Sequence, residues 1–299
     1  AREAYQSSTD YFDSGIRNRI EQNIRQFNSQ HPAGSKYLSD AYRARSKFFR
    51  PKTRASIRKS EAIAAEAFFS GDEVIGVEPE NDEDQRGMAS AEAYKFMLSY
   101  RLKKTIPWFQ TVLGAYQETM AVGVVTSLQE WRYDQNTGLD KPAVELIPPE
   151  NFRFDPAADW FDPIGTSPYL IHLMPMYVGD VRAKMRQGVW TEASDSEILT
   201  AIRSQGDSIR LAREHPRQDS KEQTGVTAFQ IVWIHRNIIR VDGLDLCFHT
   251  LGTQRLLDTP QLVSDYPGWC GVRPYVMGCC VVEAHKVYPP GVAELTAHT

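Results

Sequence analysis

The chain has 299 residues, of which 41% are hydrophobic and 24% charged, and its formal net charge is −4. This length is enough to bury a sizeable core in one or two domains, and no apolar run approaches the roughly 20 residues that cross a bilayer, so we expect no membrane partner. The slightly acidic balance argues against a protein that binds nucleic acid over its whole surface.

The first predicted element is an amphipathic helix over residues 11–27. Its apolar side chains are three and four residues apart, which places them in one stripe along a helix. The segment His31-Pro32-Ala33-Gly34 ends this helix, because proline and glycine interrupt helical structure.

Residues 36–59 form a strongly basic segment, named here the basic arm, with nine Lys or Arg residues against Asp40 alone. Such residues can grip phosphates while aromatic neighbours pack or stack, so the arm is the candidate site for contact with DNA or with a neighbouring subunit. The alternative is a solvated charge run that pairs with the acidic residues after Gly71. The candidate residues are Arg43, Arg45, Lys47, Arg50, Lys52, Arg54, Arg58 and Lys59.

A short helix to Phe69 follows the arm, and the charge then reverses. Seven Asp or Glu residues lie between residues 72 and 84. The two opposite charge blocks can pair within one chain or between neighbouring subunits. Exposed ion pairs are worth about 0–1 kcal/mol each, so this pairing would set register more than stability.

Two further helices and a hairpin are predicted next. Residues 88–102 and 107–122 have apolar side chains at helical spacing, and Gly123 ends the second of these helices. Residues 124–133 are rich in strand formers, and a turn at residues 136–138 leads to a hairpin partner at residues 143–147.

The proline-rich residues 148–159 are expected to be a rigid, extended connector. Helices over residues 176–188 and 194–212 follow, and then a polar loop at residues 215–225. The last part is β-rich: residues 229–236 alternate in the manner of a strand, and Asp242-Gly243 is typical of a hairpin turn that joins residues 238–241 to 244–250.

These elements predict an α+β fold of mixed helices and antiparallel strands. We divide the chain into residues 1–70, with the N-terminal helices and basic arm, residues 71–225, an α/β body, residues 226–290, a β-rich segment, and residues 291–299, the start of another helix. Neither Gly nor Pro stops that last helix, so we expect the chain to be part of a longer protein.

Motifs for catalysis are missing from the sequence. It contains no glycine-rich phosphate loop, no nucleophile elbow and no paired-histidine zinc helix, so we expect neither an enzyme nor a cofactor. The nearest approach to a metal site is Asp155, Asp159 and Asp162, although Asp-Pro pairs also form turns. His235 and His249 lie in neighbouring predicted strands and could face each other.

The four cysteines are Cys247, Cys270, Cys279 and Cys280. They fit free thiols in a reducing compartment better than a disulfide framework. A zinc site would need paired Cys or His residues at regular spacing, which these positions lack.

The order of these features resembles the portal proteins of tailed bacteriophages, especially those of short-tailed phages. The basic arm leads into an alanine-rich helix, a second helix, a glycine break and a strand that carries Trp131. Three further segments are similar: the connector Pro148-Pro149-Glu150-Asn151-Phe152-Arg153-Phe154-Asp155-Pro156-Ala157, the Asp242-Gly243 hairpin leading to Leu256-Leu257-Asp258-Thr259-Pro260, and Gly271-Val272-Arg273-Pro274-Tyr275-Val276. The resemblance covers roughly residues 10–299.

The resemblance implies a structural protein. Portal proteins form rings, typically of twelve subunits, at one vertex of the virus capsid; they belong to the virion and assemble in the host cytoplasm. Their partners are the major capsid protein, the terminase motor during packaging, tail adaptor proteins and the double-stranded DNA that passes through the ring. By resemblance, residues 71–290 are the outer wing of a portal subunit and residues 291–299 begin its stem helix.

Two alternatives remain open on the sequence. One is a metal-dependent enzyme that processes nucleic acid through Asp155, Asp159 and Asp162. The other is a scaffold or adaptor protein that binds nucleic acid through the basic arm without forming a closed ring.

Overall fold

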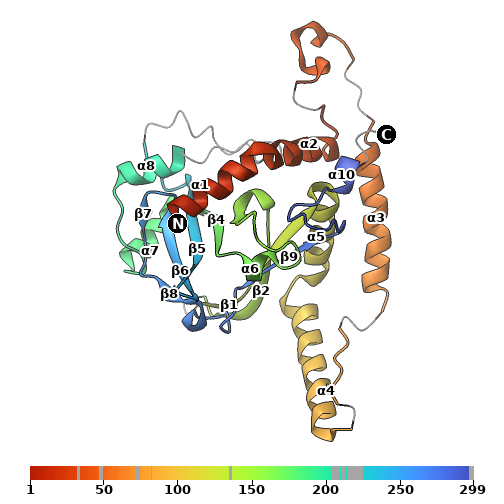
Figure 1. Cartoon of the computed structure of the whole chain (residues 1–299), viewed down its shortest axis with the longest axis vertical. Coiled ribbons are helices and arrows are strands. Elements are labelled where there is room, and N and C mark those ends of the chain that lie inside the picture. The colour runs from red at the N-terminus through yellow and green to blue at the C-terminus, as the bar shows by residue number, and fades with distance from the viewer. Residues whose placement is uncertain are drawn as a thin grey trace.

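The computed structural model describes residues 1–31, 34–46, 50–71, 75–81, 83–134, 137–203, 209, 213 and 225–295. The described residues fold into helices and two antiparallel sheets with connecting loops, so the predicted α+β fold class is confirmed (Figure 1). Among the described residues, no helix has both the length and the apolar character needed to cross a membrane.

The N-terminal helices form one rod that lies across the body of the molecule (Figure 1). Helix α1 (Arg2–Tyr11) continues through a π-helical turn, η1 (Phe12–Ile16), into α2 (Arg17–Phe27). The apolar stripe predicted for residues 11–27 is confirmed, because its side chains face the core. The buried members of this stripe are Phe12, Ile16, Ile20, Ile24 and Phe27.

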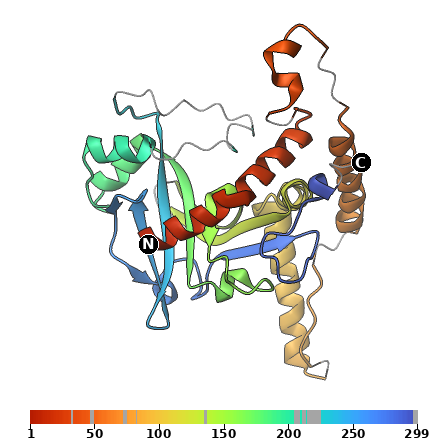
Figure 2. The ribbon, with the colours of Figure 1, turned by 45° about the horizontal axis from the view of Figure 1, so that its top comes forward.

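The next helices stand at one side of the molecule. Two short 3-10 turns, η2 (Lys36–Leu38) and η3 (Asp40–Tyr42), precede α3 (Lys52–Phe69). Helix α4 (Gln85–Tyr100) and the π-helical turn η4 (Arg101–Thr105) then lead back to α5 (Trp108–Val122). Residues 52–105 are named here the limb, since α4 extends away from the sheets in both ribbon views (Figures 1 and 2).

A three-stranded sheet has the order β2-β1-β9. Its strands are β1 (Val124–Asp134), β2 (Leu139–Ile147) and β9 (Tyr275–Cys279). Thr126 pairs with Ile147 in the hairpin and with Met277 on the other side. The hairpin predicted between residues 124–133 and 143–147 is therefore confirmed.

The second sheet has the order β3-β4-β5-β6-β7, with β8 paired to β6. Its strands are β3 (Phe152–Phe154), β4 (Tyr169–Tyr177), β5 (Ile231–Val241), β6 (Leu244–Leu251), β7 (Arg255–Leu256) and β8 (Gln261–Leu262). The turn predicted at Asp242-Gly243 is confirmed: both residues have positive φ, at 50° and 80°, and Val241 pairs with Leu244.

Short helices connect these strands. They are η5 (Pro149–Asn151), α6 (Pro163–Thr166), α7 (Val178–Arg186), α8 (Asp195–Arg203), η7 (Val263–Asp265) and α10 (Val292–Leu295). Helix α10 lies within the predicted segment 291–299, of which residues 296–299 are outside the described residues. Most of residues 204–224, including the greater part of the predicted polar loop, are also outside them.

Three sequence predictions are corrected by the strands. Strand β4 was not predicted, and the helix expected from Met176 begins at Val178. The connector at residues 148–159 is not extended throughout, because it contains η5 and β3. The two strands expected around Arg236 and Ile238 are one continuous strand, β5.

Both sheets join distant parts of the sequence. Strand β4 pairs with β5 across residue 225, and β1 pairs with β9 about 150 residues later. The segments 71–225 and 226–290 thus contribute strands to the same sheets.

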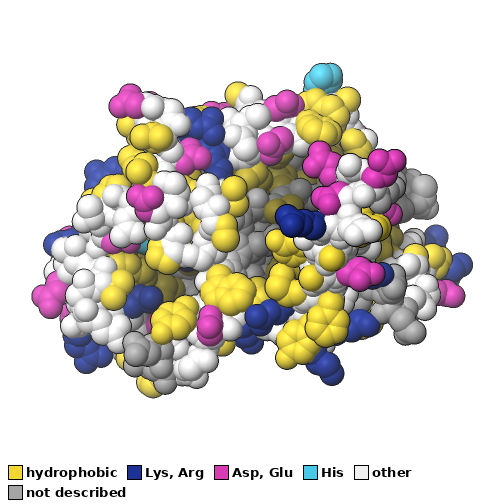
Figure 3. Space-filling view, turned by 90° about the horizontal axis from the view of Figure 1, so that it is seen from below, with side chains coloured by type: hydrophobic (Ala, Val, Ile, Leu, Met, Phe, Trp, Pro, Cys, Tyr) yellow, Lys and Arg dark blue, Asp and Glu magenta, His cyan; other side chains and the backbone are white. Residues whose placement is uncertain are grey.

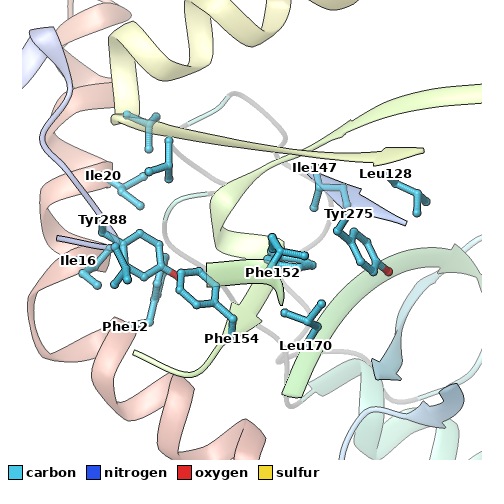
Figure 4. Close-up of a cluster of buried hydrophobic side chains, with 14 of the residues drawn as sticks. Phe12, Ile16, Ile20, Leu128, Ile147, Phe152, Phe154, Leu170, Tyr275 and Tyr288 are labelled. Atoms are coloured by element: carbon cyan, nitrogen blue, oxygen red, sulfur yellow. The ribbon is translucent and has the colours of Figure 1, made fainter. Parts of the chain in front are cut away.

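Aromatic side chains fill the core between the N-terminal rod and the two sheets (Figure 4). The ring of Phe154 stacks on Tyr288 at 5.1 Å, and Phe152 lies 4.9 Å from Tyr275. Each fully buried side chain of this size contributes about 1.5–3 kcal/mol. A second apolar cluster packs α7 and α8 against β5 and β6, on the sheet face that also carries Ile238 and Cys247 of the first cluster.

The C-terminal segment is locked to the end of α5 by two glycines. Gly123 has φ 108°, and a Cβ atom there would lie 2.2 Å from the Pro289 carbonyl oxygen. A Cβ atom on Gly291 would lie 2.7 Å from the Ala121 oxygen. Only glycine permits this approach of two backbones, which sets α10 beside α5.

Candidate functional site

The basic arm lies at one end of the molecule's longest axis, at the top of Figure 1. It consists of η2, η3, the turn that follows and the first two turns of α3. Lys47 lies outside the described residues. The other seven candidate residues are all exposed: Arg43, Arg45, Arg50, Lys52, Arg54, Arg58 and Lys59.

Two arginines of α3 also contact the end of the N-terminal rod. The guanidinium groups of Arg54 and Arg58 lie 5.5 and 5.9 Å from the centre of the Phe27 ring. Arg58 additionally forms an ion pair with Glu61 at 2.7 Å. Exposed cation–π contacts are worth about 0.5–1 kcal/mol, so these contacts orient α3 while leaving the cationic surface open to a partner.

The acidic block lies beyond the opposite end of α3, towards the tip of the limb (Figure 1). Its described acidic residues, Glu78, Glu80, Glu83 and Asp84, are exposed and are named here the acidic turn. Asp84 accepts a hydrogen bond from the backbone N–H of Arg86 and thereby caps α4. In the described part of the chain no ion pair joins the acidic turn to the basic arm, so the opposite charges do not meet within one subunit.

The limb also exposes large apolar side chains. Ala91 is the one buried residue of α4, whereas Phe96 is 78% exposed. Extended apolar surface of this kind marks a place where another molecule binds. The exposed apolar residues of the limb are Ile63, Phe68, Met88, Tyr94, Phe96, Met97, Leu98 and Tyr100. Hydrophobic side chains gather on the face viewed from below (Figure 3).

A buried row of polar side chains crosses the six-stranded sheet. His172 of β4 pairs with Arg236 of β5, which pairs with His249 of β6, so the three side chains share one face. Arg236 donates to His249 at 3.3 Å and to Glu130 of the other sheet at 3.3 Å. His249 Nδ1 lies 2.6 Å from the Asp258 carboxylate, and the Tyr275 hydroxyl lies 3.3 Å from His172 Nδ1.

Burial controls the protonation of this row. It lowers the pKa of His172 from 6.5 to about 3, with a further contribution from the charge of Arg236. Burial also lowers the pKa of His249, although the hydrogen bond to Asp258 opposes this. Both rings are therefore neutral near pH 7 and serve as partners for Arg236 and Tyr275. The row joins the two sheets through satisfied hydrogen bonds, which is a structural role.

The groove nearest this row does not expose its histidines. It has a volume of about 890 Å³ and lies between α6, the β5–β6 hairpin and β9. Its lining includes Tyr275, Arg273 and Asp245 but neither His172 nor His249. Arg273 is already bonded to Asp245 through two hydrogen bonds of 2.7 Å, so its charge is neutralised within the wall.

A second buried charge cluster joins the connector to α5. Arg213 donates to Glu150 of η5 at 2.7 Å and to Glu118 of α5 at 3.0 Å. Glu150 is 1% exposed, and its burial raises its pKa even though the charge of Arg213 acts in the opposite direction. A guanidinium between two carboxylates stabilises both charges, so this cluster holds η5 against α5.

The three aspartates proposed as a metal site each complete a local turn instead. Asp155 accepts from the N–H of Ala157, Asp159 from that of Phe161, and Asp162 from that of Gly165. Within the ranges that the structure describes, no group of three or more His, Cys, Asp or Glu side chains could hold a metal ion. The turn-forming interpretation of these aspartates is confirmed and the metal-site alternative is not supported, because each carboxylate accepts a hydrogen bond from the backbone of its own turn.

The sequence left open whether His235 and His249 face each other, and the structure shows that they do not. His235 is opposite Thr250 in the β5–β6 ladder, while His249 is opposite Arg236. The two imidazoles therefore lie on opposite faces of the sheet. The His235 ring lies 4.7 Å from the Tyr5 ring of α1, on the side of the N-terminal rod.

Sequence reasoning missed the buried row because it missed β4. His172 and Arg236 come together only through the β4–β5 ladder. The available signal was a run of apolar residues at 169–174, typical of a buried strand and followed by Pro175.

No protein-family model matches the chain, and no similar sequence is found among curated proteins.

Proposed function

We propose that this chain is a subunit of the portal ring of a tailed bacteriophage, of the short-tailed type. The ring forms a channel for double-stranded DNA during packaging and ejection, and joins the virus head to the tail. The observation that carries the proposal is the surface of the arm and limb, which exposes apolar side chains on α4 and opposite charges towards the two ends of α3. A subunit of a closed ring has such surfaces because its neighbours cover them.

The order of motifs supports the same function. The arm, the helices before and after the limb tip, the glycine break at Gly123 and the Trp131 strand follow one another as in portal proteins. The connector segment folds into η5 and β3, where Glu150 and Arg153 are buried. Because these residues join α5, the rod and the sheet, the connector is a structural junction and not a catalytic loop.

The proposed ring transforms no substrate. In the virion it would contact the major capsid protein and tail adaptors, and during packaging it would bind the terminase motor. The proposed function therefore depends on the contacts between subunits and not on a binding pocket. The basic arm is a candidate contact for a neighbouring subunit or for DNA.

Electron microscopy of the purified full-length protein tests this function. We expect closed rings in views along the symmetry axis, with a central hole wide enough for duplex DNA. Mass photometry of the same sample gives the number of subunits. A monodisperse monomer or dimer would overturn the portal proposal, and DNA binding by such a monomer would favour the adaptor alternative.

A further inference from the structure

The two charged groups of the limb lie too far apart to neutralise each other. Helix α3 has 18 residues, and at 1.5 Å rise per residue it separates its ends by about 27 Å. The arm lies before this helix and in its first two turns, and the acidic turn comes after its other end (Figures 1 and 2). Of the arm residues that the structure describes, Arg58 forms an ion pair, and its partner is Glu61 of the same helix.

The position of the cations is unfavourable for α3 itself. Lys52 and Arg54 lie in its first turn, which contains no acidic residue. The N-terminus of a helix carries a partial positive charge, so each cation there costs about 0.3–1 kcal/mol. Carboxylates from outside the subunit would offset this cost, since the acidic turn of the same chain is out of reach.

A second copy of the chain supplies those carboxylates in a head-to-tail contact. A two-fold contact centred on the arm would place Lys and Arg against Lys and Arg, which repel, and the proposed closed ring requires a head-to-tail contact. A head-to-tail contact places the arm against an acidic turn, and its repetition produces a closed ring or a filament. The exposed apolar side chains of α4 begin directly after the acidic turn, so they can add buried area to the same contact.

We propose that the basic arm of one subunit binds the acidic turn of the next subunit, and that this contact sets the register of the assembly. The proposal rests on the proposed ring function and adds which surfaces of neighbouring copies meet. The basic side is Arg43, Arg45, Arg50, Lys52, Arg54 and Lys59; the acidic side is Glu78, Glu80, Glu83 and Asp84.

Charge reversal with rescue tests the contact in the full-length protein. One variant carries Lys52→Glu, Arg54→Glu and Lys59→Glu, and the other carries Glu78→Lys, Glu80→Lys and Glu83→Lys. Arg58 and Asp84 stay unchanged, because they pair with Glu61 and cap α4. The first variant keeps α3 folded, since Glu in the first turn favours a helix. The control reverses the exposed Lys141 and Arg186 of the body to Glu.

We expect each reversed variant to need at least about tenfold more protein than wild type for half of it to assemble at low salt. The double variant with all six changes, and an equimolar mixture of the two single-side variants, should both recover assembly, because their contacts are again complementary. The control should assemble like wild type. Circular dichroism of each variant checks that the helices remain folded.

Other outcomes separate the two proposals. A wild-type protein that does not assemble overturns the portal function itself. Rings that form equally well from wild type and both reversed variants overturn the charge contact while leaving the ring intact. If the Lys/Arg reversal leaves assembly unchanged but abolishes binding to a short DNA duplex, the arm is a DNA contact and the subunit proposal is wrong.

Discussion

Arg236 is one of the residues at which the two sheets meet. Its guanidinium lies in the histidine row of the six-stranded sheet, bonds to Glu130 of the three-stranded sheet and lies 5.5 Å from the Trp269 ring. A buried arginine needs several acceptors and a nearby negative charge, because water no longer solvates it. Neutral His249 accepts one of its hydrogen bonds, and burial together with the charge of Arg236 lowers the pKa of both histidines.

His172 makes stability depend on pH in a defined direction. In the unfolded chain its imidazole binds a proton near pH 6.5, whereas in the fold its pKa is about 3. The unfolded state therefore gains protons first, and stability falls as the pH drops through this window, by several kcal/mol in total. Urea unfolding of wild type between about pH 7 and about pH 4 should show this loss.

The variant His172→Gln removes the titrating ring, and we expect it to flatten this part of the pH profile. The exposed His285 gives the matched control, as His285→Asn, which should keep the wild-type slope. If His172→Gln and wild type lose stability equally over the same pH range, another group controls the dependence.

At the scale of elements, the sequence predicted the helices and strands whose apolar side chains recur at regular spacing. Helices α2, α4 and α5 and the β1–β2 hairpin have apolar side chains at regular spacing, so local sequence was enough, whereas residues 2–10 of the rod were not predicted to be helical. Strand β4 lacks regular apolar spacing, because its first half is buried on both faces. It also contains Pro175, which argues against a strand. Whether Asp155, Asp159 and Asp162 converge or complete separate turns stayed open for a different reason, because composition does not say where side chains point.

Gly123 is a feature that the sequence did identify, as the end of α5, although its second role needed the structure. Gly123→Ala would strain a backbone with φ 108° and push a methyl group into the Pro289 carbonyl. We expect a loss of at least about 1–3 kcal/mol in the free energy of unfolding, measured by urea titration. Gly138→Ala is the control, since Gly138 also has positive φ, 66°, but a Cβ atom there meets nothing within 4 Å. Equal losses in both variants would mean that strain alone matters.

At the scale of the whole molecule, the limb behaves differently from the body. The body buries two apolar clusters, whereas α4 exposes aromatic side chains that add nothing to the stability of a single subunit. The sequence could predict these helices and their charges, but not that α4 would lack an intramolecular partner. Tertiary packing alone decides which apolar stripe is covered.

We expect the combined variant Tyr94→Ser, Phe96→Ser and Tyr100→Ser to lose assembly while keeping the thermal stability of the dissociated subunit within about 0.5 kcal/mol. Sedimentation velocity measures the first effect and calorimetry of dilute samples the second. A matched control replaces the buried Ile57 of α3 by Ser, which should unfold the subunit at lower temperature. Wild-type assembly by the triple variant would exclude α4 from the subunit contact.

The pairing of β1 with β9 has a consequence for how the protein is made. On the ribosome, β1 and β2 emerge early, but the strand that completes their sheet follows about 150 residues later. Pairings this distant are slow, and they leave an open strand edge exposed while synthesis continues. Truncated or stalled chains that end before Tyr275 would carry that edge into the cell, where they are prone to aggregate. The three-stranded sheet can therefore form only after the ribosome has translated the chain as far as Cys279.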